Sequence, residues 1–251
     1  YRSNLIMGKI LEMTTSGIIS IDTKGESVGQ VNALAVISMG DSSFGKPSRI
    51  TATISPGRQG IIDVERESQL GGRLHTKGVM IIGGYIADKY AQNAPLSMVA
   101  RLEFEQTYEE VDGDSASSAE LYCLLSRLSN SPINQGIAVT GSTNQKGEVQ
   151  AIGGVNQKIE GFFYACNAKG LTGDQGVMIP TSNTQHLMLH SDVVQAVEQG
   201  LFHIYSVSTI DEGIEILTGT AAGSIETDGS FTNQSINHKV KHQLDEMSKG
   251  M

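Results

Sequence analysis

Residues 112–128 read DGDSASSAELYCLLSRL, a turn followed directly by a helix-like stretch. The first three residues favour a turn, and the apolar spacing after them predicts a helix over residues 115–128, which ends before the Ser-Pro pair at 131–132. A serine at such a helix start is usually an N-cap, and Asp114 is an equally good cap. The same geometry exposes the Ser115 hydroxyl beside the first amides of the helix, where a developing oxyanion would be stabilised. Ser115 is therefore either a cap or a nucleophile.

The rest of the chain alternates between strand-like and helix-like patterns. Apolar or alternating runs rich in Val, Ile and Thr predict strands over residues 29–39, 49–54, 60–64, 99–106, 136–140, 148–152, 176–179 and 202–207. Helical spacing of apolar residues predicts helices over residues 74–90, 155–168, 192–198 and 210–217. This alternation at short spacing indicates a layered α/β or α+β domain.

The composition changes after residue 219. Residues 220–234 are rich in Ser, Thr, Gly and Asn, which is typical of a linker or a poorly packed tail. Residues 235–249 have weak helical character and are expected to form a solvated terminus. We therefore predict one domain over residues 1–219 and a flexible or weakly helical C-terminal tail over residues 220–251.

Length, charge and cysteine content argue against several classes of protein. The chain has 251 residues, a net charge of −9 and no apolar run near the roughly 18 residues of a membrane span. The acidic balance argues against a broad nucleic-acid surface. The two cysteines, Cys123 and Cys166, form no CxxC or Cys/His cluster, so a zinc site or a disulfide framework has little support. The first residues, YRSN, have no signal-peptide layout and no initiator Met, so we expect an excised part of a cytoplasmic protein that does not enter membranes.

A glycine-rich segment, GDSSFGK at residues 40–46, matches the beginning of a nucleotide-binding P-loop. The next residue is Pro47, where a P-loop needs Ser or Thr to hold Mg²⁺. A P-loop also opens a helix, whereas the residues after Pro47 have the pattern of a strand. We therefore expect a turn between strands and no ATP hydrolysis by this chain alone.

A nucleophilic serine needs a general base. None of the 6 histidines lies in a motif that ties it to Ser115, and the pair His186 and His190 lacks the HExxH pattern. Lys158 is the other candidate, because its helix continues into the apolar run FFYA at residues 162–165. A lysine held against an apolar wall loses solvation of its charged form, so its pKa falls and it becomes a base near pH 7. Most helix lysines are simply solvated, and that alternative stays open.

Two long motifs are specific enough to suggest a family. Residues 108–120 read YEEVDGDSASSAE, and the stretch from Ala138 to Lys158 contains AVTGS, KGEV and GGVNQK. Together they resemble the two signatures of the Lon-type protease proteolytic domain, in the Gly-Asp-Ser-Ala-Ser form of the B-type group. The spacing also fits, because Lys158 follows Ser115 by 43 residues. The resemblance covers roughly residues 5–219 and implies a compact α+β fold with mixed sheets flanked by helices.

The resemblance implies a serine endopeptidase with a Ser-Lys dyad. By position, Ser115 would be the nucleophile and Lys158 its general base and later acid. Thr140 falls where the family has a hydroxyl that supports the lysine, although an ordinary strand threonine is the alternative. Asp112 falls where some B-type members have an acid that pairs with the lysine and holds the site inactive, or else it only shapes the turn. Phe104, Tyr108 and Met98 would line a substrate groove or belong to the core.

The resemblance also implies partners and cofactors. Whole-length members carry an ATPase module, degrade unfolded polypeptides in an ATP-dependent manner and assemble as rings, usually hexamers. ATP and Mg²⁺ are expected to bind only in such a module, and the proteolytic domain itself is expected to need neither a metal nor an organic cofactor. Two other functions stay open: a ring-forming scaffold or regulatory domain with a locked dyad, and a peptidase of narrow specificity that cleaves its own chain or one partner.

Overall fold

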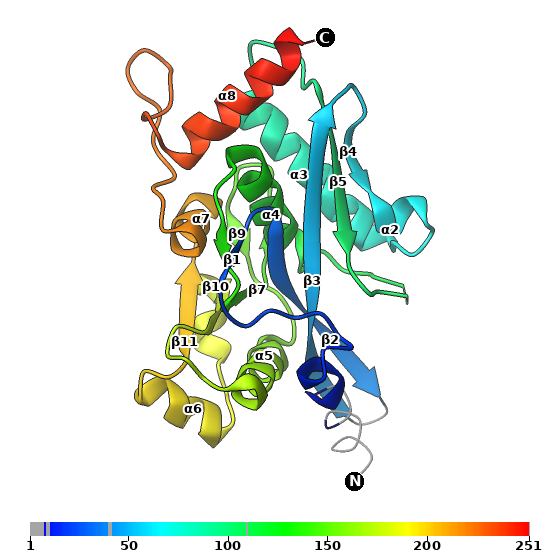
Figure 1. Ribbon diagram of the computed structural model, residues 1–251, viewed down its shortest axis with the longest axis vertical. Helices are drawn as coiled ribbons and strands as arrows, with labels where there is room; N and C mark the ends of the chain where they lie inside the picture. Colours follow the sequence, from blue (N-terminus) through cyan, green and yellow to red (C-terminus); the bar gives the residue numbers. More distant parts are fainter. Residues whose placement is uncertain (1–7, 9–10, 40–41, 109, 251) are drawn as a thin grey trace.

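A mixed sheet forms the centre of the computed structural model, which describes residues 8, 11–39, 42–108 and 110–250 (Figure 1). Its seven strands lie in the order β11-β10-β7-β2-β3-β5-β4. Their bounds are β2 Gln30–Met39, β3 Ser42–Pro56, β4 Gly60–Asp63, β5 Met98–Phe104, β7 Ile137–Val139, β10 Gly176–Pro180 and β11 His203–Val207. Neighbouring strands are parallel except at β2–β3 and β3–β5, which are antiparallel. Two small antiparallel pairs join β1 (Glu26–Ser27) to β6 (Ile133–Asn134) and β8 (Ser142–Thr143) to β9 (Val149–Gln150).

The helices cover both faces of this sheet. Their bounds are α2 Val64–Glu67, α3 Arg73–Tyr90, α4 Ser117–Ser129, α5 Val155–Lys169, α6 Ser191–Glu198, α7 Ile210–Thr218 and α8 Ile236–Lys249, with a 3₁₀ turn, η1, over Thr181–His186. Nearly every residue of α4 is buried, as expected for a helix that is packed between other layers and not at the surface. The predicted α+β fold, with a mixed sheet flanked by helices, is confirmed.

Two apolar cores lie on opposite faces of the sheet, because successive side chains of a strand point to opposite sides. In β2, Val31 and Ala33 join a core with residues of α3, α4, α7 and α8, whereas Leu34 joins a second core with α5 and α6. In β10, Met178 faces the first core and Val177 the second. The strands are therefore buried on both sides, which holds their ends in fixed positions beside the site described below.

The long hairpin of β2 and β3 accounts for part of the P-loop-like segment. Its register runs from Gln30 opposite Thr51 to Met39 opposite Ser42. Residues 43–46 lie within β3, which is a strand and not the start of a helix. Gly40 and Asp41 lie outside the described residues. The described part of this segment therefore lacks the helix that a P-loop requires.

The C-terminal helix α8 differs from the solvated terminus that the sequence predicts. Its apolar side chains Ile236, Val240 and Leu244 are buried in the first core, where α8 packs against α4. The Tyr90 hydroxyl of α3 also donates a hydrogen bond to the Asn237 side chain. The expectation of a solvated terminus is wrong for this helix, because its few apolar residues recur at helical spacing and fall on one face.

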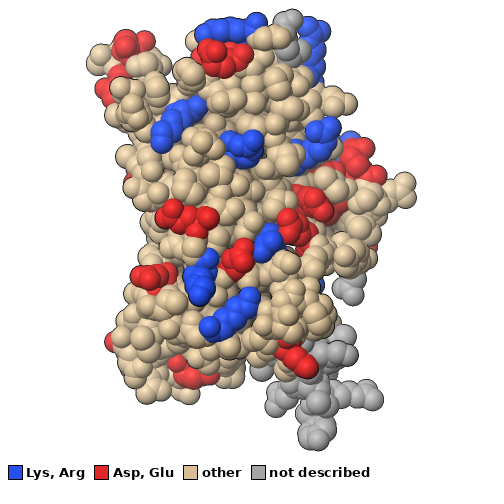
Figure 2. All heavy atoms as spheres, viewed as in Figure 1, with Lys and Arg blue, Asp and Glu red and all other residues tan. Residues whose placement is uncertain are grey.

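Charged side chains are distributed without a broad patch of one sign on the face that Figure 2 shows, where basic and acidic groups are interspersed among uncharged residues. Within the described ranges, no helix is both long enough and apolar enough to span a membrane.

Candidate active site

The turn before α4 positions the Ser115 side chain. The Ser115 carbonyl accepts a hydrogen bond from the amide of Gly141 at 2.9 Å, and the amide of Ser118 donates to the Gly141 carbonyl at 3.1 Å. These two bonds fix the start of α4 to the chain that leaves β7. The helix begins at Ser117 with Ala116 in the cap position, and no side chain caps it. The expectation that Ser115 or Asp114 caps the helix is therefore wrong, and the Ser115 hydroxyl is free for another contact.

That contact comes from Lys158 on α5. Its Nζ donates to Ser115 Oγ at 2.9 Å and to Thr140 Oγ1 at 3.0 Å. The α5 helix starts immediately after Gly154, whose φ of 66° lies in the left-handed region that glycine adopts at low cost. Lys158 therefore lies in the first turn of the helix, next to β7 and the Ser115 turn.

Burial changes the acidity of Lys158. The side chain is 3% exposed, and this loss of solvation lowers its pKa from 10.5 to about 8, although the charge of Asp114 raises it in part. Desolvation disfavours the ammonium form, so a substantial fraction of Lys158 is neutral at mildly alkaline pH. The structure thus gives one buried amine of lowered pKa in contact with one serine hydroxyl.

Thr140 connects the two groups. It follows β7, is buried, and its hydroxyl donates to the Ser115 carbonyl at 3.3 Å while it accepts from Lys158 Nζ. One side chain therefore holds both the backbone of Ser115 and the amine of Lys158.

Asp112 does not pair with Lys158. Its Oδ1 instead accepts the amide of Leu74 at 3.0 Å, at the start of α3. The hydrogen bond from the Gly113 amide, followed by those of the α3 amides, lowers the pKa of Asp112. Of the two alternatives that the sequence leaves open, the structure supports the one in which Asp112 shapes the turn, and the salt bridge to Lys158 is absent.

Asp114, which the sequence suggested only as a helix cap, is the acid that acts on the lysine. Its Oδ2 accepts a hydrogen bond from Ser142 Oγ at 3.2 Å, and its charge opposes the lowered pKa of Lys158. In the sequence, the one indication of this role is that Asp114 directly precedes Ser115. The turn brings its carboxylate close enough for its charge to act on Lys158.

A groove of about 430 Å³ opens beside Ser115 and Lys158. Much of its lining has small side chains or none, including Ala33 and Ala35 of β2 and Gly153 and Gly154 before α5. Phe104 also lines the groove, whereas Met98 is fully buried in the core and Tyr108 is 84% exposed. Of the three residues considered for this role, only Phe104 lines the groove.

Comparison with known proteins finds one matching family and several relatives. Residues 107–219 match the Lon protease (S16) C-terminal proteolytic domain. The chain is 47% identical over 201 residues to a putative Lon protease homolog of Escherichia coli (strain K12), which covers 79% of this chain and 34% of the relative. It is 41% identical over 244 residues to a putative Lon protease homolog of Haemophilus influenzae, covering 95% of this chain and 41% of the relative.

A third relative is archaeal. The Archaeal Lon protease of Thermococcus kodakarensis is 35% identical over 207 residues, which cover 78% of this chain and 28% of that protein. These matches span 28% to 41% of the relatives' lengths. Ser115, Thr140 and Lys158 all fall within the region that matches the family.

Proposed function

Because this chain belongs to the Lon protease (S16) proteolytic-domain family, we propose that it is a serine endopeptidase in which Ser115 and Lys158 form the catalytic dyad. The observation that carries the proposal is the 2.9 Å contact between Lys158 Nζ and Ser115 Oγ in a buried setting. A nucleophile and a base within hydrogen-bond reach are the geometric requirement for covalent catalysis by serine.

The reaction proceeds in two halves. Neutral Lys158 takes the hydroxyl proton of Ser115 as Oγ attacks the carbonyl carbon of a peptide bond. The protonated lysine then gives this proton to the nitrogen of the leaving amine, the C–N bond breaks, and an acyl-enzyme remains on Ser115. Water, deprotonated by Lys158, hydrolyses the ester and restores the serine. The pKa of about 8 suits both steps, since the group must accept and release a proton near neutral pH.

Thr140 and the start of α4 position these groups. Thr140 Oγ1 accepts one hydrogen bond from Lys158 Nζ, and this contact helps to keep Nζ within reach of Ser115 Oγ. At the turn, the amides of Ser117 and Ser118 are already bonded to the carbonyls of Asp114 and Gly141. An oxyanion would therefore be stabilised by the amides of Ser115 and Ala116, which precede the first helical turn.

Unfolded polypeptides are the substrate class that suits the groove. Its alanine and glycine lining lets a main chain approach Ser115 closely. Following the family resemblance, we extend the proposal to a cytoplasmic, ATP-dependent protease in which this domain works beside an ATPase module in a homo-oligomeric ring, a hexamer in the family. ATP and Mg²⁺ then act in that module, and the peptidase reaction itself uses no metal or organic cofactor.

Peptide hydrolysis by the parent chain and by Ser115→Ala tests the dyad. The alanine variant is expected to keep its fold and lose activity, because the nucleophile is gone. Ser118→Ala is a matched control, since Ser118 lies in the same motif and its buried hydroxyl has no hydrogen-bond partner among the described residues. Activity that persists in a folded Ser115→Ala variant would eliminate Ser115 as the nucleophile.

A serine-directed reagent separates the proposal from the alternatives. Mass spectrometry should find the label on Ser115 of the parent. A locked scaffold would show neither label nor hydrolysis, and a peptidase of narrow specificity would react with the reagent but leave a panel of unfolded proteins intact.

A further inference from the structure

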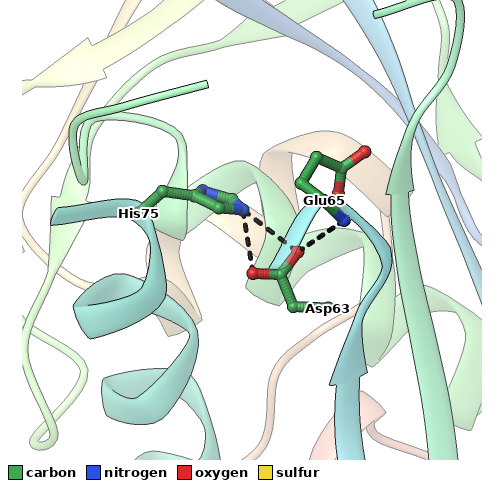
Figure 3. Close-up of side chains that lie close together, drawn as sticks. All are labelled: Asp63, Glu65 and His75. Atoms are coloured by element: carbon green, nitrogen blue, oxygen red, sulfur yellow. Dashed lines mark hydrogen bonds and ion pairs between the residues drawn. The ribbon is translucent and has the colours of Figure 1, made fainter. Parts of the chain in front are cut away.

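A second cluster of ionisable side chains lies behind the groove, at the junction of β4, α2, α3 and α4. Figure 3 shows Asp63 at the end of β4, Glu65 in α2 and His75 in α3 grouped together. They are only 3%, 4% and 1% exposed, and Glu120 of α4, at 1%, completes the group. Acidic side chains are almost never this buried unless something pairs with them.

The polar atoms of these side chains lie close to His75 Nε2. His75 Nε2 lies 3.2 Å from each of the two carboxylate oxygens of Asp63. Glu120 Oε1 lies 4.0 Å from the same nitrogen. One ligand atom each from Asp63, Glu65 and His75 lie within 4.8 Å of one another. His75 and Asp63 thus form a buried hydrogen-bonded ion pair, which keeps a nitrogen and two oxygens that can act as ligands next to one another.

Some carboxylate oxygens of the cluster have no hydrogen-bond partner among the described residues. Glu65 Oε1 accepts the amide of Phe104 at 2.8 Å, which fixes that carboxylate. Its Oε2, together with Glu120 Oε1, is buried without a hydrogen-bond partner within the described parts of the chain. A buried, unpartnered carboxylate oxygen is costly.

We propose that Asp63, Glu65, His75 and Glu120 together bind one divalent transition-metal ion of the Zn²⁺ type. An imidazole nitrogen favours such an ion over Mg²⁺ or Ca²⁺, which take oxygen ligands. Bonds of about 2.0–2.2 Å place the ligands of a tetrahedral ion about 3.3 Å apart. The His75–Asp63 separation of 3.2 Å matches this value, whereas the two glutamates must move closer, since Glu120 Oε1 lies 4.0 Å from His75 Nε2.

The ion has a structural role, because four protein ligands leave no open position for a substrate. It would join four elements, β4, α2, α3 and α4, near the nucleophile turn, since Glu120 lies in the first turn of α4, shortly after Ser115. The His75 ring also packs edge-on against Phe104, with ring centres 5.4 Å apart, and Phe104 lines the groove. Cysteine content alone gave no indication of this site, because its ligands are three carboxylates and one histidine.

Metal titration of the whole chain tests the proposal. After dialysis against a chelator, calorimetry with Zn²⁺ should give one site per chain, and thermal unfolding should shift to higher temperature. Excess Mg²⁺ should not compete. His75→Gln and Glu120→Gln should each weaken Zn²⁺ binding by about 100-fold or more, because each removes a ligand.

The matched control is the double variant His238→Gln, His242→Gln. These histidines lie four residues apart on α8 and form a possible surface zinc site far from the cluster in the sequence. The double variant should keep the affinity of the parent. The proposal is overturned if the double variant loses Zn²⁺ binding or if the parent binds no Zn²⁺. In the second case, the four side chains form a hydrogen-bonded network in which bound protons neutralise the carboxylates.

X-ray absorption of the zinc-loaded parent identifies the atoms that bind the ion, so it tests the proposal even if the cluster variants fail to fold. The spectrum should fit one nitrogen and three oxygen ligands. A shell that contains sulfur, or two or more imidazoles, would place the ion elsewhere and overturn the assignment.

Discussion

The behaviour of Lys158 illustrates what single residues contribute to this molecule. The sequence predicted its lowered pKa from the apolar run that follows it in α5, and burial does lower that pKa. The sequence did not predict which acid faces it. Gly113 lies between Asp112 and Asp114 with a φ of 100°, so the chain reverses there, and the two carboxylates point to different partners. Spacing along the chain does not reveal such a reversal, because it depends on the local backbone conformation.

The lowered pKa predicts the pH dependence of peptide hydrolysis. The neutral, basic form of Lys158 increases as pH rises through about 8, so kcat/KM should rise through the same range. Lys158→Arg should be about as inactive as Lys158→Ala, with losses of about 10²–10⁴-fold, because arginine keeps the charge but does not act as a base. Rates of peptide cleavage from pH 6 to pH 10 measure both effects. An arginine variant that retained activity would show that Lys158 acts only through its charge.

The two aspartates of the turn should respond differently to substitution. Asp114→Asn removes a charge that raises the pKa of Lys158, so the rising limb of the pH–rate profile should move to lower pH. Asp112→Asn should leave that limb in place, because Asp112 bonds the start of α3 and not the lysine. The profiles of both variants and the parent decide the point. If Asp112→Asn shifted the limb and Asp114→Asn did not, the electrostatic assignment would be reversed.

At the scale of elements, close approach of backbones places α5 on the sheet. Most helix limits follow from apolar spacing and came within two residues of the prediction, as for α5, expected over 155–168 and observed over Val155–Lys169. The contact that positions α5 does not follow from spacing. Gly161 faces Gly45 of β3 so closely that a Cβ atom at residue 161 would lie 2.2 Å from the Gly45 carbonyl oxygen. The sequence does not show that Gly45 and Gly161 meet, since they lie far apart along the chain.

Substitution of Gly161 therefore should disturb both stability and catalysis. Gly161→Ala should lower the free energy of unfolding by about 1–3 kcal/mol through overpacking and should lower kcat, since α5 also carries Lys158. Gly83→Ala in α3 is the control, because no atom lies within 4 Å of its added methyl group, and it should gain up to about 1 kcal/mol. Chemical denaturation and peptide hydrolysis report the two effects. Equal stability of the two variants would contradict this packing.

At the scale of the whole molecule, the sequence predicts the class of fold but not the order of its strands. Alternating patterns identify β2, β3 and β10 as strands, yet nothing in Val31 or Met178 shows that β7 lies between β2 and β10. Strand order depends on long-range pairing, which a local pattern does not contain. The same limit applies to α8, whose apolar spacing does not show that α4 is the element against which it packs.

The integration of α8 into the core predicts the outcome of truncation. A chain that ends at residue 219 loses the buried side chains of Ile236, Val240, Leu244 and Met247. At about 1.5–3 kcal/mol for each buried apolar side chain, the loss is comparable with the whole stability of a domain, about 5–15 kcal/mol. We therefore expect the truncated chain to lose cooperative thermal unfolding.

Leu244→Ala provides a graded version of the same test, with an expected loss of about 2–5 kcal/mol in the free energy of unfolding. Lys249→Ala, on the same helix but with a side chain that is 72% exposed, should change it little because no core contact is removed. Thermal and urea denaturation of the three chains measures these differences. If the chain ending at residue 219 unfolded at the temperature of the parent, α8 would be a dispensable tail, and the first core would be complete without it.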